Sequence, residues 1–494
     1  MSQKNLKQRA VSGMIWSALQ RYSTILIHFI SGIILARLLT PYDYGCIGML
    51  SIFMVLAEAF IDGGFGSALI QKKRPTQKDY STIFFFNIGM SVLLYAVLYV
   101  SAPAIARFYD IPLLCDVLRV QGIVLFIYAF NIIQKNQLRK VLNFKALSIV
   151  TILTSVTALV VTILMAYNGF GVWALVTQNI VTAAIPAIVF WFYIKWRPIW
   201  TFSVKSFKEL FGFGFYVFLN HLLLTFGWQI QGLLIGKFYT PTTLGYYSMA
   251  GRTENLASRS ISQVLSQVTF PLYSEVQDDK RRMISIVEKL TSVIAYLTYP
   301  LMSILILVAK PLFILLFSDR WLESVPYFQI LCVAGLGICL QSVNLQTISA
   351  IGKSRTLFIW SVIKQSIGLI LVIGGLMLFG INGLLWGMVI HSWNCTFINM
   401  YLVSRYIGYN LKSQLWSLFP ITIVTLVAFL AGYFICKDIS TGLYLSGAIK
   451  ICIFATIYMG WTILFRPKPF CTLQILIESA FKRKHETHKI HHLL

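Results

Sequence analysis

Apolar segments long enough to cross a membrane recur along the whole of this chain. A helix needs about 20 apolar residues to span the roughly 30 Å hydrocarbon core of a bilayer. With 57% hydrophobic and 12% charged residues among 494, the chain lies far outside the composition of soluble proteins. A membrane β-barrel would instead alternate polar and apolar residues. The continuous runs therefore predict an all-α integral membrane protein.

The apolar runs predict about fourteen transmembrane helices. They lie near residues 13–38, 46–70, 81–106, 113–134, 147–167, 172–194, 210–236, 244–272, 285–309, 326–351, 357–379, 384–403, 415–436 and 443–465. Basic residues gather in alternate loops and in the C-terminal tail, with 29 in one set and 6 in the other. Basic loops stay on the cytosolic side of a membrane. We therefore expect a multi-pass protein with both termini in the cytosol.

The net charge of +24 has two interpretations. Nucleic-acid binding would need a soluble basic domain, and the loops are too short to form one. The loop asymmetry explains the charge instead, so we expect no nucleic-acid partner. The eight cysteines are scattered without a metal-ligand spacing and are expected to be packing thiols. We predict neither a metal site nor a cofactor.

No catalytic motif appears in the chain. Sequences such as H-E-x-x-H, a P-loop or G-x-S-x-G are missing. The short loops between spans also leave no folded domain that could hold catalytic groups. We therefore do not expect an enzyme, and a membrane glycosyltransferase or polymerase is disfavoured.

One segment returns two hundred residues later in the chain. Residues 32–49 read GIILARLLTPYDYGCIGM, and residues 232–249 read GLLIGKFYTPTTLGYYSM. Both contain a basic residue followed by T-P-x-x-x-G. Proline restarts a helix and glycine permits close packing, so each copy is expected to form a corner on the outer side of the membrane, with gating as the alternative role.

The copies begin six spans apart, and an even separation makes them parallel repeats. Transporters with parallel repeats place their substrate site between the two halves. The predicted organisation is an N-terminal lobe at 1–209, a C-terminal lobe at 210–414, two appended spans at 415–465 and a cytosolic basic tail at 466–494.

Charged side chains inside spans are the candidate site residues, because their cost in a membrane is usually offset by a cavity or a partner. The candidates for substrate binding are basic or amide side chains: Arg21, Arg119, Gln229, Arg252, Arg259, Gln263 and Lys364. Three acidic side chains, Glu58, Asp62 and Glu254, are candidates for coupling or for pairing with these charges. The alternative for each of these side chains is structural: it pairs with an opposite charge on a neighbouring helix, or it extends to the polar surface of the membrane. Asp62 begins DGGFG, where we expect the helix to kink or unwind.

Guanidinium groups bind phosphate in a bidentate manner, and amides suit sugar hydroxyls. These residue types therefore favour a large, anionic and hydroxylated substrate. Basic side chains outnumber acidic ones in the lobes only slightly, so a cation substrate stays open on the residues alone.

Segments along nearly the whole chain resemble one transporter family. They are ILARLLTPYDYG (34–45), GFGSALIQKK (64–73), APAIARFY (102–109), QKNQLRKVLNFKAL (134–147), GFGVWALV (169–176), LLIGKFYTPTTLGYYSMAGR (233–252), FPLYSEVQDD (270–279) and FSDRWLESVPYFQIL (317–331). Together they resemble the Wzx-type polysaccharide exporters of the multidrug/oligosaccharidyl-lipid/polysaccharide superfamily, close to the colanic-acid and teichuronic-acid exporters. The chain departs from relatives at Gln231 and Asn143, where those often carry acidic residues, so a coupling role at Gln231 is not carried over.

The resemblance implies twelve core helices in two six-helix lobes around a central cavity, with two further C-terminal helices. It implies a flippase in the bacterial cytoplasmic membrane that translocates an undecaprenyl-diphosphate-linked oligosaccharide by alternating access, for surface polysaccharide such as O-antigen. Membrane lipids, a polysaccharide polymerase and a chain-length regulator are the implied partners. A cation-coupled drug or cation antiporter of the same superfamily is the first alternative, and a lipid II flippase is another.

Overall fold

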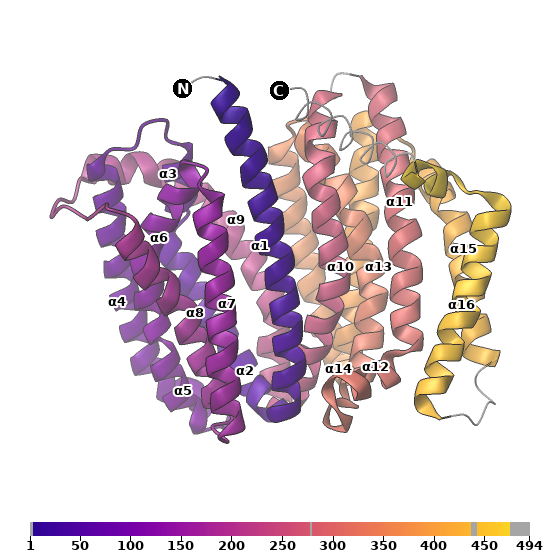
Figure 1. The fold of residues 1–494 in the computed structure, drawn as a ribbon, viewed down its shortest axis with the longest axis horizontal. Coiled ribbons are helices and arrows are strands. Elements are labelled where there is room, and N and C mark those ends of the chain that lie inside the picture. Colours follow the sequence, from indigo (N-terminus) through magenta and orange to yellow (C-terminus); the bar gives the residue numbers. More distant parts are fainter. Residues whose placement is uncertain (1–2, 277–278, 436–441, 475–494) are drawn as a thin grey trace, which may run out of the picture. The chain divides into compact units, whose positions relative to one another are not determined.

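Long helices dominate the computed structural model, which describes residues 3–276, 279–435 and 442–474 (Figure 1). The chain divides into two compact units, Met1–Ser248 and Met249–Leu494. Helix α10 starts in the first unit and continues into the second. The lobe boundary expected between residues 209 and 210 stays a prediction, as do the other domain limits.

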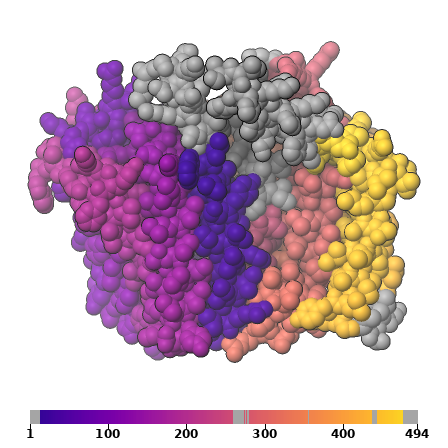
Figure 2. Space-filling model, in the orientation of Figure 1, coloured from indigo at the N-terminus to yellow at the C-terminus, as the bar shows by residue number. Residues whose placement is uncertain are grey.

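The first unit contains nine helices and the start of a tenth within the described residues. They are α1 (Gln3–Leu38), α2 (Pro41–Asp62), α3 (Phe65–Gln71), α4 (Gln77–Phe108), α5 (Leu113–Gln121), α6 (Ile123–Lys140), α7 (Phe144–Tyr167), α8 (Val172–Tyr193), α9 (Val204–Phe238) and α10 (Pro241–Glu275). Helix α1 packs along α7, α7 on α8, and α9 on both α2 and α3. Figure 2 shows α1, in indigo, lying against the surface of this unit.

The second unit contains the remaining helices. They are α11 (Lys280–Leu307), α12 (Ala309–Phe317), the short 3-10 helix η1 (Asp319–Trp321), α13 (Ser324–Ala350), α14 (Ser354–Ile407), α15 (Leu411–Ile435) and α16 (Leu443–Phe465). Helix α13 packs on α11 and α14, and α15 packs on α11 and α16.

Twelve helices among the described residues are long and apolar enough to cross a membrane. One of them, Arg355–Ile407, contains Gly380 at φ 63° and ψ −148°, which is not helical. It therefore holds two of the predicted spans. Helix α10 is not among the twelve, and it coincides with the charged eighth span of the prediction. The all-helical membrane fold is confirmed, and the count of fourteen is approximate.

The two T-P motifs begin helices, as their chemistry predicts. The Thr40 hydroxyl accepts a hydrogen bond from the Asp43 backbone N–H, and Asp43 in turn accepts one from the Thr40 backbone N–H. Pro41 occupies the first helical position, where its missing N–H costs nothing. At α10 the Thr240 hydroxyl caps the Thr243 N–H in the same way.

The two corners also pack against each other inside the first unit. A Cβ on Gly45 would collide with the carbonyl oxygen of Pro241, and a Cβ on Gly245 would collide with that of Pro41. The contact is thus reciprocal and made by backbone on backbone. Beside it, Lys237 donates a hydrogen bond of 2.6 Å to the carbonyl oxygen of Phe108. Glycine at both positions is required for this approach.

The DGGFG segment breaks the second span, as expected. Helix α2 ends at Asp62, Gly63 and Gly64 adopt left-handed φ values of 52° and 74°, and α3 begins at Phe65. A Cβ on Gly64 would collide with the backbone carbonyl of Gly214 in α9. The break therefore lets two helix backbones meet.

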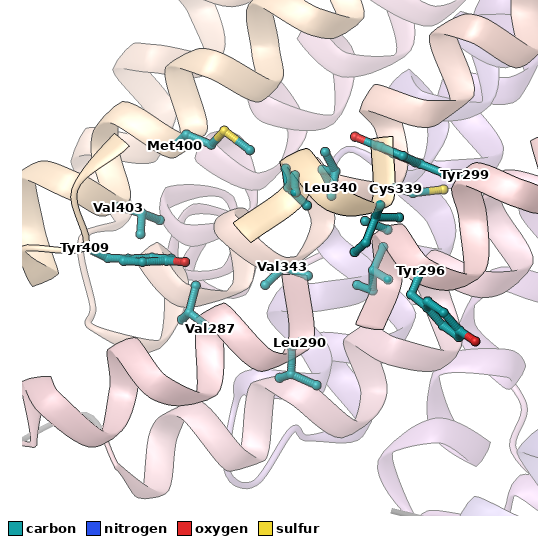
Figure 3. Packing of buried hydrophobic residues seen from close by; sticks show 14 of the residues in the cluster. Val287, Leu290, Tyr296, Tyr299, Cys339, Leu340, Val343, Met400, Val403 and Tyr409 are labelled. Atoms are coloured by element: carbon teal, nitrogen blue, oxygen red, sulfur yellow. The ribbon is translucent and has the colours of Figure 1, made fainter. Parts of the chain in front are cut away.

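The second unit is built around a large apolar core shared by α11, α13 and α14 (Figure 3). Val287 and Leu290 of α11 face Val343 of α13, with Val403 of α14 in the same cluster. Helix α16 is tied to α11 because the Tyr458 hydroxyl donates a 2.8 Å hydrogen bond to the carbonyl oxygen of Tyr296. The last two spans, expected only as an appendage, thus pack on the core of this unit.

Large apolar side chains stay exposed on the outside of the helices. Leu164 on α7 is 58% exposed, and Ile463 on α16 is 70% exposed. In water such a surface would be costly, whereas lipid tails solvate it without a penalty. The outer surfaces of both units therefore suit a bilayer.

Candidate binding cavity in the first unit

A cavity of about 440 Å³ lies among five helices of the first unit. The lining combines amides, hydroxyls and two charged groups with aliphatic and aromatic side chains. The residues are Ile47, Ser51, Met54, Val55 and Glu58 of α2; Gln121 of α5; Val124, Tyr128, Asn131 and Lys135 of α6; Leu147 and Thr151 of α7; and Asn179, Thr182, Ala183, Pro186 and Phe190 of α8. Its size is that of a small-molecule site, since such pockets typically hold about 300–1,000 Å³.

Glu58 and Lys135 bring opposite charges into this cavity. Each lies in the electrostatic field of the other. In the part of the chain that the structure describes, however, no direct ion pair joins them. Lys135 is exposed to the cavity, and Glu58 is half-buried. Both groups can therefore hydrogen-bond a molecule that enters between them.

Gln121 is the most deeply buried polar side chain of the lining. It is 4% exposed, and its Oε1 has no hydrogen-bond partner among the described residues. Leaving a buried acceptor unsatisfied costs about 1–3 kcal/mol. The neighbouring Asn131 is partly satisfied, because its Nδ2 donates to the carbonyl oxygen of Ala183 at 3.5 Å. Gln121 thus adds to the cavity wall an amide whose buried oxygen is not satisfied by the described residues.

Of the predicted site residues, Glu58 lines the cavity and Gln229 lies at its edge. The Ser51 hydroxyl, which lines the cavity, donates to Gln229 Oε1 at 3.4 Å. Asp62, one turn beyond Glu58, instead lies at the helix break, with its carboxylate close to the backbone of Gly64 and Gly66. Its role in coupling or charge pairing stays a prediction.

Two predicted basic residues of the first unit lie away from the cavity lining. The Arg119 guanidinium lies over the ring of Tyr99, 4.5 Å from its centroid. Arg21 on α1 is partly exposed, and its buried Nε has no hydrogen-bond partner among the described residues. Substrate binding by either residue stays a prediction.

The predicted residues of the second unit have different surroundings. The ammonium group of Lys364, 8% exposed, donates a 2.9 Å hydrogen bond to Asn399 Oδ1. Glu254 is 4% exposed, and a Cβ on Gly335 would collide with its Oε1. Arg252 is exposed. The side chains of Arg259 and Gln263 lie outside the described residues, so their roles also stay predictions.

Sequence reasoning missed Lys135 and three amides of the cavity. The predicted fourth span ends at residue 134 and so leaves Lys135 in the following loop, whereas α6 continues to Lys140. Gln121, Asn131 and Asn179 lie in spans whose amides were not considered. Applying the same search for amides to the fourth and sixth spans would have found them. Among the described residues, no group of three or more His, Cys, Asp and Glu is placed to hold a metal.

The helical bundle with an internal polar cavity is the architecture of a membrane transporter. The family described as "Polysaccharide biosynthesis protein" matches residues 34–326, which is more than half of the chain. The chain belongs to this family, and the family expected from the sequence segments is thereby confirmed.

Curated relatives agree with this assignment. The chain is 25% identical over 358 residues to the teichuronic acid biosynthesis protein TuaB of Bacillus subtilis (strain 168), covering 72% of this chain and 74% of TuaB. It is 22% identical over 437 residues to the lipopolysaccharide biosynthesis protein WzxC of Escherichia coli (strain K12), covering 86% and 87% of the two chains.

Solved structures show the same fold. The lipid II flippase MurJ in an inward closed conformation matches with a TM-score of 0.77 at 14% identity, covering 92% of this chain and 99% of MurJ. An inward-facing multidrug transporter of the MATE family matches with a TM-score of 0.61 at 14% identity, covering 81% and 95%. At such identities the likeness concerns the fold alone.

Proposed function

We propose that this protein is a flippase that translocates an undecaprenyl-diphosphate-linked oligosaccharide across the bacterial cytoplasmic membrane for surface polysaccharide synthesis. The observation that carries this proposal is membership of the polysaccharide biosynthesis family over residues 34–326 in a chain of membrane-spanning helices. The names of TuaB and WzxC, which refer to teichuronic acid and lipopolysaccharide biosynthesis, support the saccharide substrate. Both termini are proposed to be cytosolic, following the charge of the loops.

In the proposed mechanism, basic side chains hold the diphosphate while the polyprenyl tail stays in lipid. Arg21, Arg252 and Arg259 are the proposed ligands, because guanidinium groups bind phosphate oxygens in pairs. Arg119, Lys364, Gln229 and Gln263 are proposed as further contacts to the head group. Glu254 is the proposed charge partner within α10.

Alternating access requires two lobes to change their packing around the substrate. We assign these lobes to residues 1–209 and 210–414. The appended spans and the basic tail are not part of the proposed movement. The reciprocal contact of Gly45 with Pro241 and of Gly245 with Pro41 joins one corner from each proposed lobe. Because backbone atoms meet there directly, the proposed outward opening has to separate or rotate these corners.

The direct test uses proteoliposomes that contain the purified full-length protein and an undecaprenyl-diphosphate-linked oligosaccharide. Lectin accessibility from outside measures the fraction of saccharide that has crossed the bilayer. We expect the wild-type protein to expose saccharide from the inner leaflet and Arg259→Ala to lose most of this activity, while Arg405→Ala, an exposed arginine on α14, serves as the matched control. Wild-type flipping by Arg259→Ala would remove the role assigned to that arginine.

The same vesicles separate the proposed function from its rivals. An antiporter would move a lipophilic cation such as ethidium against a proton or sodium gradient and leave the lipid-linked saccharide in place. A lipid II flippase would move lipid II and not the oligosaccharide. Either result, obtained with the wild-type protein, would replace the proposed function.

A further inference from the structure

The lining of the cavity among α2, α5, α6, α7 and α8 includes none of the arginines proposed for the diphosphate. We propose that it is a subsite for one neutral, hydroxyl-rich sugar ring of the transported saccharide. This inference rests on the proposed function and adds to it a class of ligand and a set of contacts that lie wholly within the first unit.

The cavity volume fits one sugar ring and not a whole oligosaccharide. At about 440 Å³ it lies in the lower part of the range of small-molecule sites. A lipid-linked oligosaccharide is several rings long, so it cannot be enclosed here as a whole, whereas a single ring fits with room to spare.

Gln121 supplies the observation that points to a ligand. Its side chain is 4% exposed, lines the cavity, and has an unpartnered Oε1 among the described residues. Because this oxygen is buried in the wall, the amide has to rotate toward a bound ring; a sugar hydroxyl can then donate to its oxygen and accept from its N–H group. Asn179, on the α8 side of the same cavity, offers both a donor and an acceptor.

The pair of charges decides the net charge of the ligand. One acidic and one basic side chain line the cavity, Glu58 and Lys135, so their charges cancel and neither a cation nor an anion gains a net attraction. A neutral polyhydroxylated ring can instead use both groups at once. It can donate to Glu58 and accept from Lys135, and hydrogen bonds to charged groups are stronger than those between neutral groups.

Apolar side chains complete the resemblance to a sugar site. Met54, Val55, Pro186 and Phe190 line the cavity together with the polar groups. Sugar rings have C–H faces as well as hydroxyl edges, and an aliphatic and aromatic wall packs on such faces. The mixed lining thus matches both surfaces of a pyranose ring.

The test measures binding of methyl β-D-glucopyranoside to the full-length protein in detergent by saturation-transfer difference NMR. Methyl β-D-glucuronide and tetraphenylphosphonium serve as the anionic and cationic probes. We expect saturation transfer to the neutral glucoside and none to either charged probe. Transfer to a charged probe alone would overturn the proposal and indicate an anion or cation site instead.

Variants then locate the binding. We expect Gln121→Leu and Lys135→Met each to weaken glucoside binding about tenfold, because each removes a hydrogen bond from a desolvated ligand. Gln178→Leu on α8 and Lys195→Met in the following loop are the matched controls, since neither lines the cavity; they should bind as the wild type does. Equal binding by all four variants would overturn the subsite.

Where a cavity variant fails to reach the membrane, competition in the wild-type protein decides. The lipid-linked oligosaccharide should displace the glucoside if the ring occupies the same cavity, and lack of displacement would overturn the proposal. Flipping in vesicles is scored separately. Flipping without glucoside binding refutes the subsite alone, whereas glucoside binding without flipping refutes the function and leaves a sugar site.

Discussion

The two units of the chain both carry charged side chains within their helices, but they surround them differently. In the first unit Glu58 and Lys135 face a cavity and form no direct ion pair with each other within the described residues. In the second unit Lys364 is bonded to Asn399 and closely enclosed. An intramembrane charge therefore does not by itself mark a binding site. A binding site also requires a cavity beside the charge and hydrogen-bonding capacity that the protein itself does not use.

The largest effect on stability is expected from Asn399→Leu. This change leaves the Lys364 ammonium group, 8% exposed, without its 2.9 Å hydrogen bond. A lost hydrogen bond to a buried charge costs about 1.5–3 kcal/mol. The unfolding temperature in detergent should fall clearly, and the double variant Lys364→Met/Asn399→Leu should recover much of the loss. An unchanged unfolding temperature in Asn399→Leu would place Lys364 in a cavity of its own.

A smaller loss is expected from Gly335→Ala in α13. The added Cβ would collide with Glu254 Oε1 and come within 3.5 Å of the Met302 sulfur. Overpacking of this kind costs about 1–3 kcal/mol. Gly374→Ala on α14 is the control, because nothing lies within 4 Å of its added Cβ, and it should be neutral or stabilising. If Gly335→Ala and Gly374→Ala have the same unfolding temperature, the side chain of Glu254 can move away from the added methyl group without cost.

A third environment is the membrane-proximal loop at Lys72. Its Nζ lies 3.0 Å from both Asp79 Oδ2 and Glu209 Oε2; Lys72 is 22% exposed, Glu209 is 56% exposed and Asp79 is 2% exposed. Lys72→Ala should cost only about 0.5–1 kcal/mol in thermal unfolding, since solvent screens the pair with Glu209 and the buried Asp79 keeps its hydrogen bond from the Thr76 backbone N–H. Glu209→Gln should account for less than half of that cost, and a loss above 2 kcal/mol would mean that the loop is more enclosed than its exposure indicates.

The pH dependence of this contribution has a definite sign. Burial lowers the pKa of Lys72, but hydrogen bonds to Glu209 and Asp79 outweigh it, so the pKa is raised above its ordinary value of 10.5. A raised pKa means that the stabilisation is fully present below the unfolded value and is lost as pH rises through the folded value. The difference between wild type and Lys72→Ala should therefore be constant from neutral pH to about pH 9.5 and shrink above 10.5.

The smallest effect on stability is expected from Lys135→Met. Its ammonium group is exposed to the cavity and has no direct ion pair in the described structure, so unfolding should change by no more than about 0.5 kcal/mol. Glucoside binding should nevertheless weaken. A large drop in the unfolding temperature would contradict this comparison, because Lys135 would then stabilise the fold as the hydrogen bond of Lys364 to Asn399 is expected to do.

Much of the fold follows from local sequence signals. Runs of apolar residues give the spans because the membrane thickness fixes their length. The corners follow from capping chemistry, since Thr40 can close the first turn of a helix that Pro41 begins. The break after Asp62 follows from two glycines that tolerate left-handed conformations.

The cavity could not be predicted in the same way. Its lining comes from α2, α5, α6, α7 and α8, and hydropathy does not reveal which faces of these helices converge. Lys135 was hidden because a lysine near the end of an apolar run looks like a loop residue, although α6 extends beyond it. The hydrogen bond of Lys364 was hidden because Asn399 lies 35 residues farther along the chain.

The reciprocal corner contact makes the two copies of the repeated motif depend on each other. Any side chain gained at Gly45 displaces the second copy at Pro241, and any gained at Gly245 displaces the first copy at Pro41. Neither glycine can be replaced by a larger residue without displacing the backbone of the other copy. A substitution at one corner therefore needs a compensating change at the other, so the contact constrains the two copies of the motif as a single unit.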